Sequence, residues 1–271
     1  MNLFYSITLY LWNYIFSIID KNEIKILRIV CKDFRNISTN YWIQNISREE
    51  VNNYFIFSQK SNFNIRFIIL HYIQQFDFKN LNINNLLILS CEYGYLEIVK
   101  LLIKIGVNIN KKDKNSNTPL IYASSSGHLE IVKLLIKNDV NINEKNNYGC
   151  ISLFYSCEFG HLEIVKLLLE NGANINEKNI NGNTSLIYAS ENGNLEIVKL
   201  LVKNGANINE KDSIKWNPLI YASAYGYLKI VKFLVQNGAN INEKDNIGTT
   251  ALQYAKNYNQ LEIIKYLENF I

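Results

Sequence analysis

The stretch NTPLIYASSSGHLEIVKLL, residues 117–135, decides the fold of most of this chain. In its second half, apolar residues recur from Leu129 to Ile136 at intervals of three and four, which places them on one side of a helix. Glu130 and Lys133 fall on the opposite side, where they can face solvent. The pattern predicts a short amphipathic helix.

The first half of the stretch carries the signals of a second, preceding helix. Thr118 is a good N-cap, and Pro119 suits the first helical position, where its missing N–H costs nothing. Gly127 can end this helix because glycine tolerates the left-handed conformation. Residues 138–147 are polar and rich in turn formers. We therefore expect two short antiparallel helices followed by an extended turn.

This unit repeats along the chain with a period of 33 residues. Glycines stand at positions 94, 127, 160, 193 and 226, and Asn259 completes the series. Each is followed by a variant of LEIVKLL, and in the first five units NGANINEK or a degraded form of it comes next. A single helical hairpin cannot bury its apolar side, so the hairpins must stack on one another.

The repeated words resemble the ankyrin repeat family, whose units are a turn and two helices. The resemblance covers residues 77–271 and implies an all-α solenoid of about six helix-turn-helix units, preceded by a small helical N-terminal domain. The exposed polar residues of the last unit are typical of a C-terminal cap. The expected helical pairs lie near residues 86–105, 118–138, 151–171, 184–204, 217–237 and 250–270.

Two departures from the family pattern affect the expected packing. The family has a histidine after Thr-Pro-Leu that ties neighbouring repeats through hydrogen bonds. This chain has Ile121, Phe154, Ile187, Ile220 and Gln253 there, so we expect apolar packing to replace the polar tie. The glycine of the turn is present at residues 149, 182 and 248, but Ser116 and Lys215 replace it in two turns, which we expect to be looser.

Residues 1–45 are similar to an F-box, a helical motif that docks on the Skp-type linker of cullin–RING ubiquitin ligases. The similarity rests on NYIFSIIDKNEIKILRIVCKDFRN (residues 13–36) with Trp42 near the family's closing tryptophan, although Ile7–Thr8 replaces the opening Leu-Pro. On this hypothesis the linker protein is contacted by Ile15, Ile19, Ile24, Leu27, Val30 and Phe34.

The N-terminal part also allows other interpretations. Residues 1–45 could be a helical cap that shields the first repeat, and the chain would then be an ankyrin scaffold without a ubiquitin role. The uncharged, apolar residues 3–19 are at the short limit of a membrane span, and we rank an anchor below the F-box. Residues 46–76 are interpreted as a helical linker or a degenerate repeat.

Composition and motifs argue against nucleic-acid binding, catalysis and metal binding. The formal charge of +4 is weak for a nucleic-acid-binding protein, and the chain has no phosphate-binding glycine loop, HExxH or GxSxG motif. We predict no catalytic residue, no cofactor, no metal and no small-molecule substrate. The four cysteines lack CxxC spacing, which favours reduced thiols in the cytoplasm, or in the host cytoplasm for a virus or intracellular bacterium. The three histidines, residues 71, 128 and 161, are interpreted as structural.

Function is therefore expected from the surface, in binding another protein. The ankyrin resemblance implies a concave face formed by the turns and the first helices. Mapped by register, its candidate residues are Tyr93, Tyr148, Phe159, Ile180, Glu191, Ile214, Trp216 and Tyr225. Tyr148 with Phe159, and Trp216 with Tyr225, are expected to pair, since aromatic residues dominate binding hot spots. The alternative is that these rings only pack against neighbouring turns.

The leading hypothesis is an F-box and ankyrin adaptor that brings an unidentified target to a cullin–RING ligase.

Overall fold

A computed structural model describes residues 83–104 and 106–270 of the 271-residue chain. The described residues divide into two compact units. Residues 83–90 and 95–108 belong to the first unit, and residues 91–94 and 109–270 to the second. The candidate F-box residues lie outside the described residues, so that hypothesis stays a prediction.

The first unit holds most of helix α5 (Ile83–Glu92) and all of α6 (Leu96–Lys104). Leu87, Val99 and Leu102 are completely buried. The backbone N–H of Tyr95 donates to the carbonyl of Ser90 at 2.8 Å across the short connection. The helical spacing of residues 86–105 thus predicted this hairpin, whose first helix begins three residues earlier than expected.

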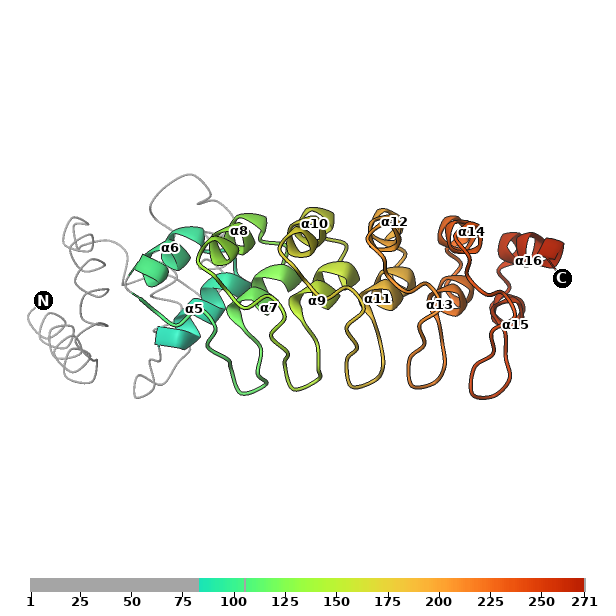
Figure 1. The fold of residues 1–271 in the computed structure, drawn as a ribbon, viewed down its shortest axis with the longest axis horizontal. Coiled ribbons are helices and arrows are strands. Elements are labelled where there is room, and N and C mark those ends of the chain that lie inside the picture. The colour runs from blue at the N-terminus through green and yellow to red at the C-terminus, as the bar shows by residue number, and fades with distance from the viewer. Residues whose placement is uncertain (1–82, 105, 271) are drawn as a thin grey trace, which may run out of the picture. The chain divides into compact units, whose positions relative to one another are not determined.

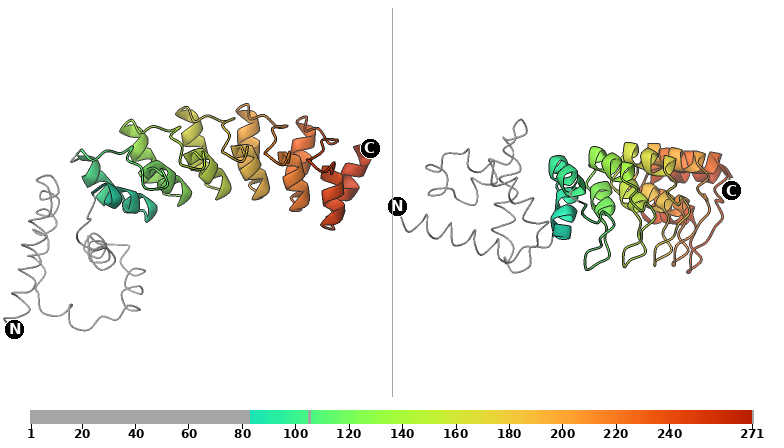
Figure 2. Two further views of the ribbon diagram at one scale, coloured as in Figure 1. Left: turned by 90° about the horizontal axis from the view of Figure 1, so that it is seen from below. Right: turned by 60° about the vertical axis from the view of Figure 1, so that its left-hand side comes forward.

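The second unit is a row of helical hairpins in two layers, with all the turns on one side (Figures 1 and 2). First helices pack on first helices and second helices on second helices. No strand occurs among the described residues, which confirms the helical solenoid. The first helices are α7 (Pro119–Ser125), α9 (Ser152–Glu158), α11 (Ser185–Glu191), α13 (Pro218–Ala224) and α15 (Ala251–Asn257). The second are α8 (Leu129–Lys137), α10 (Leu162–Glu170), α12 (Leu195–Lys203), α14 (Leu228–Gln236) and α16 (Leu261–Leu267), followed by the 3-10 turn η2 (Glu268–Phe270).

The first helices begin where their capping residues predict. The Thr118 hydroxyl accepts a hydrogen bond from the N–H of Ile121 at 3.2 Å, and Pro119 is the first helical residue. Thr184 and Asn217 cap α11 and α13 in the same way. Such a cap contributes about 1 kcal/mol, which matters in a helix of seven residues.

The glycine that ends each first helix is required for two reasons. Gly127 and Gly193 have φ values of +78° and +76°, a left-handed conformation that other residues adopt only with strain. In addition, the next repeat packs directly on the glycine. A Cβ on Gly193 would lie 2.6 Å from Cε1 of Tyr227, and one on Gly127 would lie 2.6 Å from Cε1 of His161. The 33-residue glycine series therefore records the close stacking of hairpins.

The seam between repeats is apolar at four of the five positions where the family has histidine. Residues 121, 154, 187 and 220 are at most 3% exposed, which confirms the expected packing there. The expectation is wrong at Gln253, which is exposed and caps α15 with Thr250. Because α15 uses this side chain to bond its own N-cap, the glutamine stays at the surface instead of entering the seam.

A polar tie between repeats nevertheless exists, at a different position from the family histidine. Nε2 of His128 lies 3.0 Å from the carbonyl oxygen of Glu92, and Nε2 of His161 lies 3.0 Å from that of Ser125. Nδ2 of Asn194 donates to the carbonyl of Glu158 at 3.1 Å. At these three junctions the N-cap residue of the second helix thus bonds the C-terminal end of the first helix in the preceding repeat. The apolar packing at residues 121, 154, 187 and 220 is thus accompanied by polar contacts at another position of the repeat.

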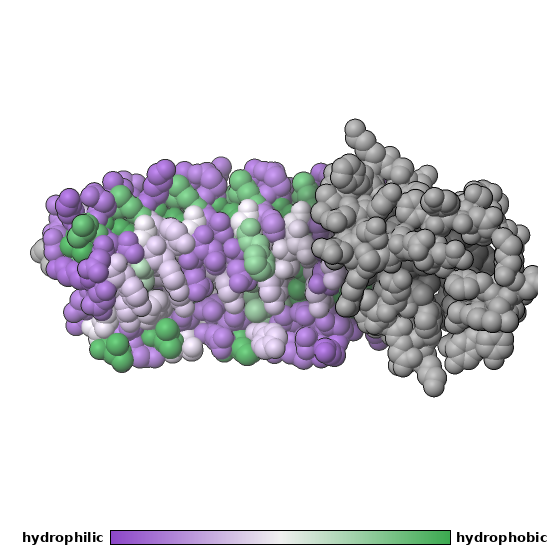
Figure 3. Space-filling view, turned by 180° about the vertical axis from the view of Figure 1, so that it is seen from behind, coloured by the Kyte–Doolittle hydropathy of each residue, from purple (hydrophilic) through white to green (hydrophobic). Residues whose placement is uncertain are grey.

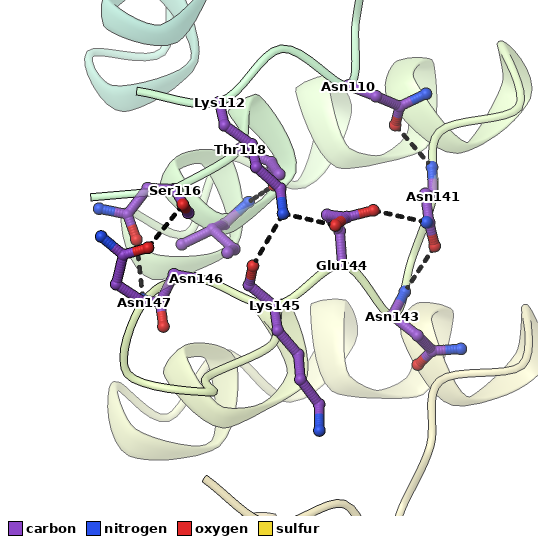
Figure 4. Close-up of polar contacts among 12 residues, drawn as sticks. Asn110, Lys112, Ser116, Thr118, Asn141, Asn143, Glu144, Lys145, Asn146 and Asn147 are labelled. Atoms are coloured by element: carbon purple, nitrogen blue, oxygen red, sulfur yellow. Dashed lines mark hydrogen bonds and ion pairs between the residues drawn. The ribbon is translucent and has the colours of Figure 1, made fainter. Parts of the chain in front are cut away.

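Side chains of the polar segment link each repeat to the next (Figure 4). Nζ of Lys112 lies 2.6 Å from Oε1 of Glu144, one repeat further on. Oδ1 of Asn110 accepts from the N–H of Asn141 at 2.8 Å. Equivalent ion pairs join residues 145 to 177, 178 to 210 and 211 to 243. Each partly exposed pair contributes only about 0.2–1 kcal/mol, so the pairs define the register of stacking more than its strength.

The two turns without glycine keep the geometry of the others. Ser116 and Lys215 adopt φ values of +60° and +64°, and their N–H groups donate to Asp113 and Asp212 at 3.0 Å. Gly149 makes the equivalent bond at 2.9 Å. The expectation of looser turns is therefore wrong, because neighbouring hydrogen bonds hold these residues in the left-handed conformation despite its cost.

We predict that Gly193→Ala lowers the urea midpoint of unfolding more than Gly172→Ala does. Both glycines are left-handed, at +76° and +86°, so both changes cost about 1–2 kcal/mol of backbone strain. Only Gly193 faces the ring of Tyr227, which adds about 1–3 kcal/mol of overpacking, whereas nothing lies within 4 Å of a Cβ on Gly172. Equal midpoints would contradict the role of close stacking.

Candidate protein-binding face

Each turn of the second unit is closed by the side chain of its first residue. Oδ1 of Asp212 accepts hydrogen bonds from the N–H groups of Ile214 at 3.0 Å and Trp216 at 2.8 Å. The side chain thereby fixes the backbone of the turn and satisfies two donors. Asp113, Asn146, Asn179 and Asp245 make the same pair of bonds in their turns.

A tyrosine of the following first helix holds each closing residue. The Tyr221 hydroxyl donates to Oδ2 of Asp212 at 2.8 Å, and where the closing residue is Asn146, its Nδ2 donates to the hydroxyl of Tyr155 at 2.9 Å. Burial is the main cause that raises the pKa of Tyr155 to about 12, so the phenol stays neutral at physiological pH. Sequence reasoning missed this tie. Its signal is a tyrosine nine residues after each closing residue: 122, 155, 188, 221 and 254.

Backbone hydrogen bonds join successive turns into one continuous edge. The N–H of Ile180 donates to the carbonyl of Tyr148 at 3.1 Å, and the N–H of Asn246 donates to that of Ile214 at 3.2 Å. Figure 3 shows separate hydrophobic patches along this lower edge, between hydrophilic stretches. The turns are therefore held to one another as well as to their helices, which gives a surface with little freedom to rearrange.

Most of the predicted binding residues are exposed. Ile180 has 66% of its surface exposed, and all six of the exposed predicted residues are above 45%. Glu191 and Trp216 are half-buried. Their placement is compatible with binding, and the binding itself stays a prediction. The six exposed residues are Tyr93, Tyr148, Phe159, Ile180, Ile214 and Tyr225.

The expected aromatic pairs are wrong. The ring of Trp216 contacts Tyr221, with centroids 4.9 Å apart, and Tyr254 of the next repeat at 4.5 Å, because the tyrosine ties bring those two rings beneath the turn. Tyr225 lies parallel to Tyr221 at 6.5 Å and makes no ring contact with Trp216 in the described chain.

Tyr148 and Phe159 also lack the expected contact. In the part of the chain that the structure describes, the ring partner of Phe159 is His161, 6.4 Å away. Phe159 follows the last residue of α9, whereas Tyr148 belongs to the turn before that helix, so the helix separates the two rings. Both side chains remain free to contact another molecule.

Two exposed residues at positions equivalent to predicted binding residues were overlooked in the sequence. Ile247 is 81% exposed and Tyr258 is 57% exposed. The repeat period itself could have found them, because Ile247 lies 33 residues after Ile214 and Tyr258 lies 33 residues after Tyr225. With them, the candidate face comprises the exposed predicted residues, Glu191, Trp216, Ile247 and Tyr258.

Acidic residues occupy the C-terminal ends of two first helices. Glu158 and Glu191 end helices α9 and α11, and both are half-buried. Burial raises the pKa of the Glu158 carboxyl. The pKa of Glu191 is raised by burial and then by the charges of Glu158 and Asp212. Among the described residues, neither glutamate takes part in an ion pair, whereas Glu163 is paired with Lys166 at 2.6 Å.

The described cysteines and acidic residues give no candidate metal site. Cys91 and Cys157 are completely buried, and burial raises the pKa of both thiols, which keeps them protonated. Residues 83–104 and 106–270 contain no cluster of three or more potential metal ligands. Within the same ranges, no helix has both the length and the apolar character needed to cross a bilayer.

Fold and surface together define a helical repeat protein of the kind that binds other proteins. The family described as "Ankyrin repeats (3 copies)" matches residues 56–146, 138–212 and 186–269. These matches cover most of the chain, which belongs to the ankyrin repeat family, a family of protein–protein interaction modules that is typically non-enzymatic. A comparison with curated proteins finds no significant match.

We predict that Asp212→Ala loosens its turn, while Asp212→Asn does not. Alanine removes the acceptor for two N–H groups and for the Tyr221 hydroxyl, at a cost of about 2–4 kcal/mol. Asparagine restores the arrangement that Asn146 and Asn179 already have. Hydrogen exchange at the amides of Ile214 and Trp216 should accelerate in the alanine variant alone. Equal acceleration in both variants would contradict the proposed geometry.

Proposed function

We propose that the protein is an adaptor that holds a target protein on its candidate face. The single observation that carries this proposal is the row of exposed apolar side chains on turns that are fixed by hydrogen bonds. Large apolar residues on a rigid surface lose little entropy when a partner binds, which is the property of binding hot spots. The tyrosine ties and the backbone bonds between turns supply that rigidity.

In this proposal the N-terminal segment connects the held target to a ubiquitin ligase. Residues 1–45 carry the F-box-like order of apolar residues, including Val30–Cys31–Lys32 and Phe34. A Skp-type linker would bind this segment, and ubiquitin transfer would be catalysed by the partners in the cytoplasm. The alternative is an ankyrin scaffold in which the same segment only shields the first repeat.

Residues 77–271 would form the binding part, and residues 46–76 would join it to the F-box-like segment. The family match begins at residue 56, before the first described helix. This start favours a degenerate repeat over a plain linker for the second half of the 46–76 segment. The repeat array would then extend towards the N-terminus by part of one unit.

We predict that Phe159→Ala combined with Tyr225→Ala reduces target capture at least about 30-fold, because two hot-spot rings together contribute more than 2 kcal/mol. The measurement is quantitative affinity purification from eukaryotic lysate with mass spectrometry. The control is Leu261→Ala with Phe270→Ala, which removes two exposed apolar side chains outside the candidate face. Equal losses in both double variants, or undiminished capture in the first, would exclude this face as the target site.

We predict that Val30→Asp with Phe34→Ala abolishes binding of a purified Skp-type linker and leaves target capture unchanged. A charge and a cavity at the apolar positions of the motif would prevent docking. The measurement is a pulldown with the full-length chain. The scaffold alternative predicts instead that no linker binds even the wild type, and that deletion of residues 1–45 lowers only stability.

A further inference from the structure

Glu191 of the candidate face and Glu158, its equivalent in the preceding repeat, lack the lysine partner that Glu163 and Glu196 have. In these two repeats, Glu163 and Glu196 bond Lys166 and Lys199 at 2.6 and 2.7 Å on the second helices. Glu158 and Glu191, at the ends of the neighbouring first helices, make no ion pair with any described residue. Lysines therefore pair with Glu163 and Glu196 on the second helices, whereas Glu158 and Glu191, like Glu170 at the end of α10, have no cation among the described residues.

The position of Glu158 and Glu191 is also electrostatically unfavourable. Each is the last residue of its helix, where the exposed carbonyls carry the negative end of the helix dipole. The two glutamates occupy equivalent places in adjacent repeats, and their charges, together with that of Asp212, oppose one another. A positive charge brought to this place would relieve all three effects at once.

An exposed aromatic residue accompanies each of these carboxylates. Phe159 follows Glu158 in sequence and is 54% exposed. The charge of Glu191 acts on the hydroxyl of Tyr225, whose pKa is raised first by burial and then by that glutamate. A planar cation could thus bond a carboxylate through its edge while its face covers a ring.

We propose that Glu158, Glu191 and the adjacent rings of Phe159 and Tyr225 bind an arginine-bearing protein segment whose arginines alternate with aliphatic residues. The inference rests on the proposed function and specifies the chemistry of the target. Arginine fits better than lysine because its guanidinium is planar, donates two parallel hydrogen bonds and stacks on aromatic rings. The aliphatic residues would contact the exposed isoleucines of the turns. A polyanion such as a nucleic acid is repelled by the same carboxylates.

The test uses the full-length chain and a synthetic twelve-residue peptide in which arginine alternates with leucine. Two comparison peptides replace each arginine by lysine or by citrulline, which is a neutral isostere. Isothermal titration calorimetry should show that the arginine peptide binds at least about 10-fold more tightly than the citrulline peptide, with the lysine peptide between them. Equal affinity of the arginine and citrulline peptides would overturn the proposal.

Two matched variants separate a local site from a general charge effect. Glu158→Gln with Glu191→Gln should abolish the advantage of the arginine peptide. Glu163→Gln with Glu196→Gln removes the same charge from the same repeats and should keep that advantage within about 2-fold, because those carboxylates are already paired. Equal losses in the two variants would show attraction by net charge alone and refute the site.

Unfolding provides a readout that does not depend on any ligand. Glu158→Gln with Glu191→Gln should unfold at a urea concentration no lower than the wild type, since the change removes repulsion. A lower midpoint would mean that the chain already compensates these carboxylates, and would refute the inference. If Phe159→Ala with Tyr225→Ala abolishes target capture while the glutamine variant captures normally, the proposed function stands and this inference fails. If the arginine peptide requires the two glutamates but Phe159→Ala with Tyr225→Ala leaves target capture unchanged, the arginine site stands and the proposed function fails.

Discussion

The structure of the second unit depends on the mutual burial of neighbouring hairpins. A helix of seven residues and one of nine, such as α7 and α8, bury too little surface between them to be stable alone. Within the stack, Leu120, Val132 and Leu135 are completely buried. The close approach this requires explains why the first helix of every hairpin ends at a residue with a left-handed conformation.

Close stacking also determines where polar groups can be satisfied. The carbonyl of Glu158, at the end of α9, has no partner within its own helix and accepts from Asn194 of a later repeat. The turns cannot stack as helices do, so side chains close them and tyrosines hold them to the helices. The closing residues of the turns and the tyrosines that contact them are thus used internally in each of these repeats. Residues that differ between repeats, such as Phe159 and Trp216, are those to which we propose to assign the choice of partner.

Local signals in the sequence were sufficient for the helices, and insufficient for the contacts between repeats. The cap at Thr118, the helix end at Gly127 and the solvent-facing Glu130 follow from neighbouring residues alone. The tyrosine ties and the relocated polar tie of His128 join groups that only the stacking brings together, so no single repeat reveals them. The pairing of Trp216 with Tyr254 was missed for the same reason. The F-box-like segment lies outside the described residues and stays a prediction.

The contacts made by the Asn-Ile-Asn-Glu-Lys segments are nearly the same at each junction. Lysine bonds glutamate 32 residues later, and asparagine accepts from a backbone 31 residues later, at several successive junctions. Any two repeats that carry these residues can therefore form the same contacts, whatever their positions in the chain. Duplication or loss of 99 nucleotides in phase with the period would therefore create a working junction at the new joint. Such an event would change the length of the array, and with it the set of proteins that the array can hold, without a search for new compatible interfaces.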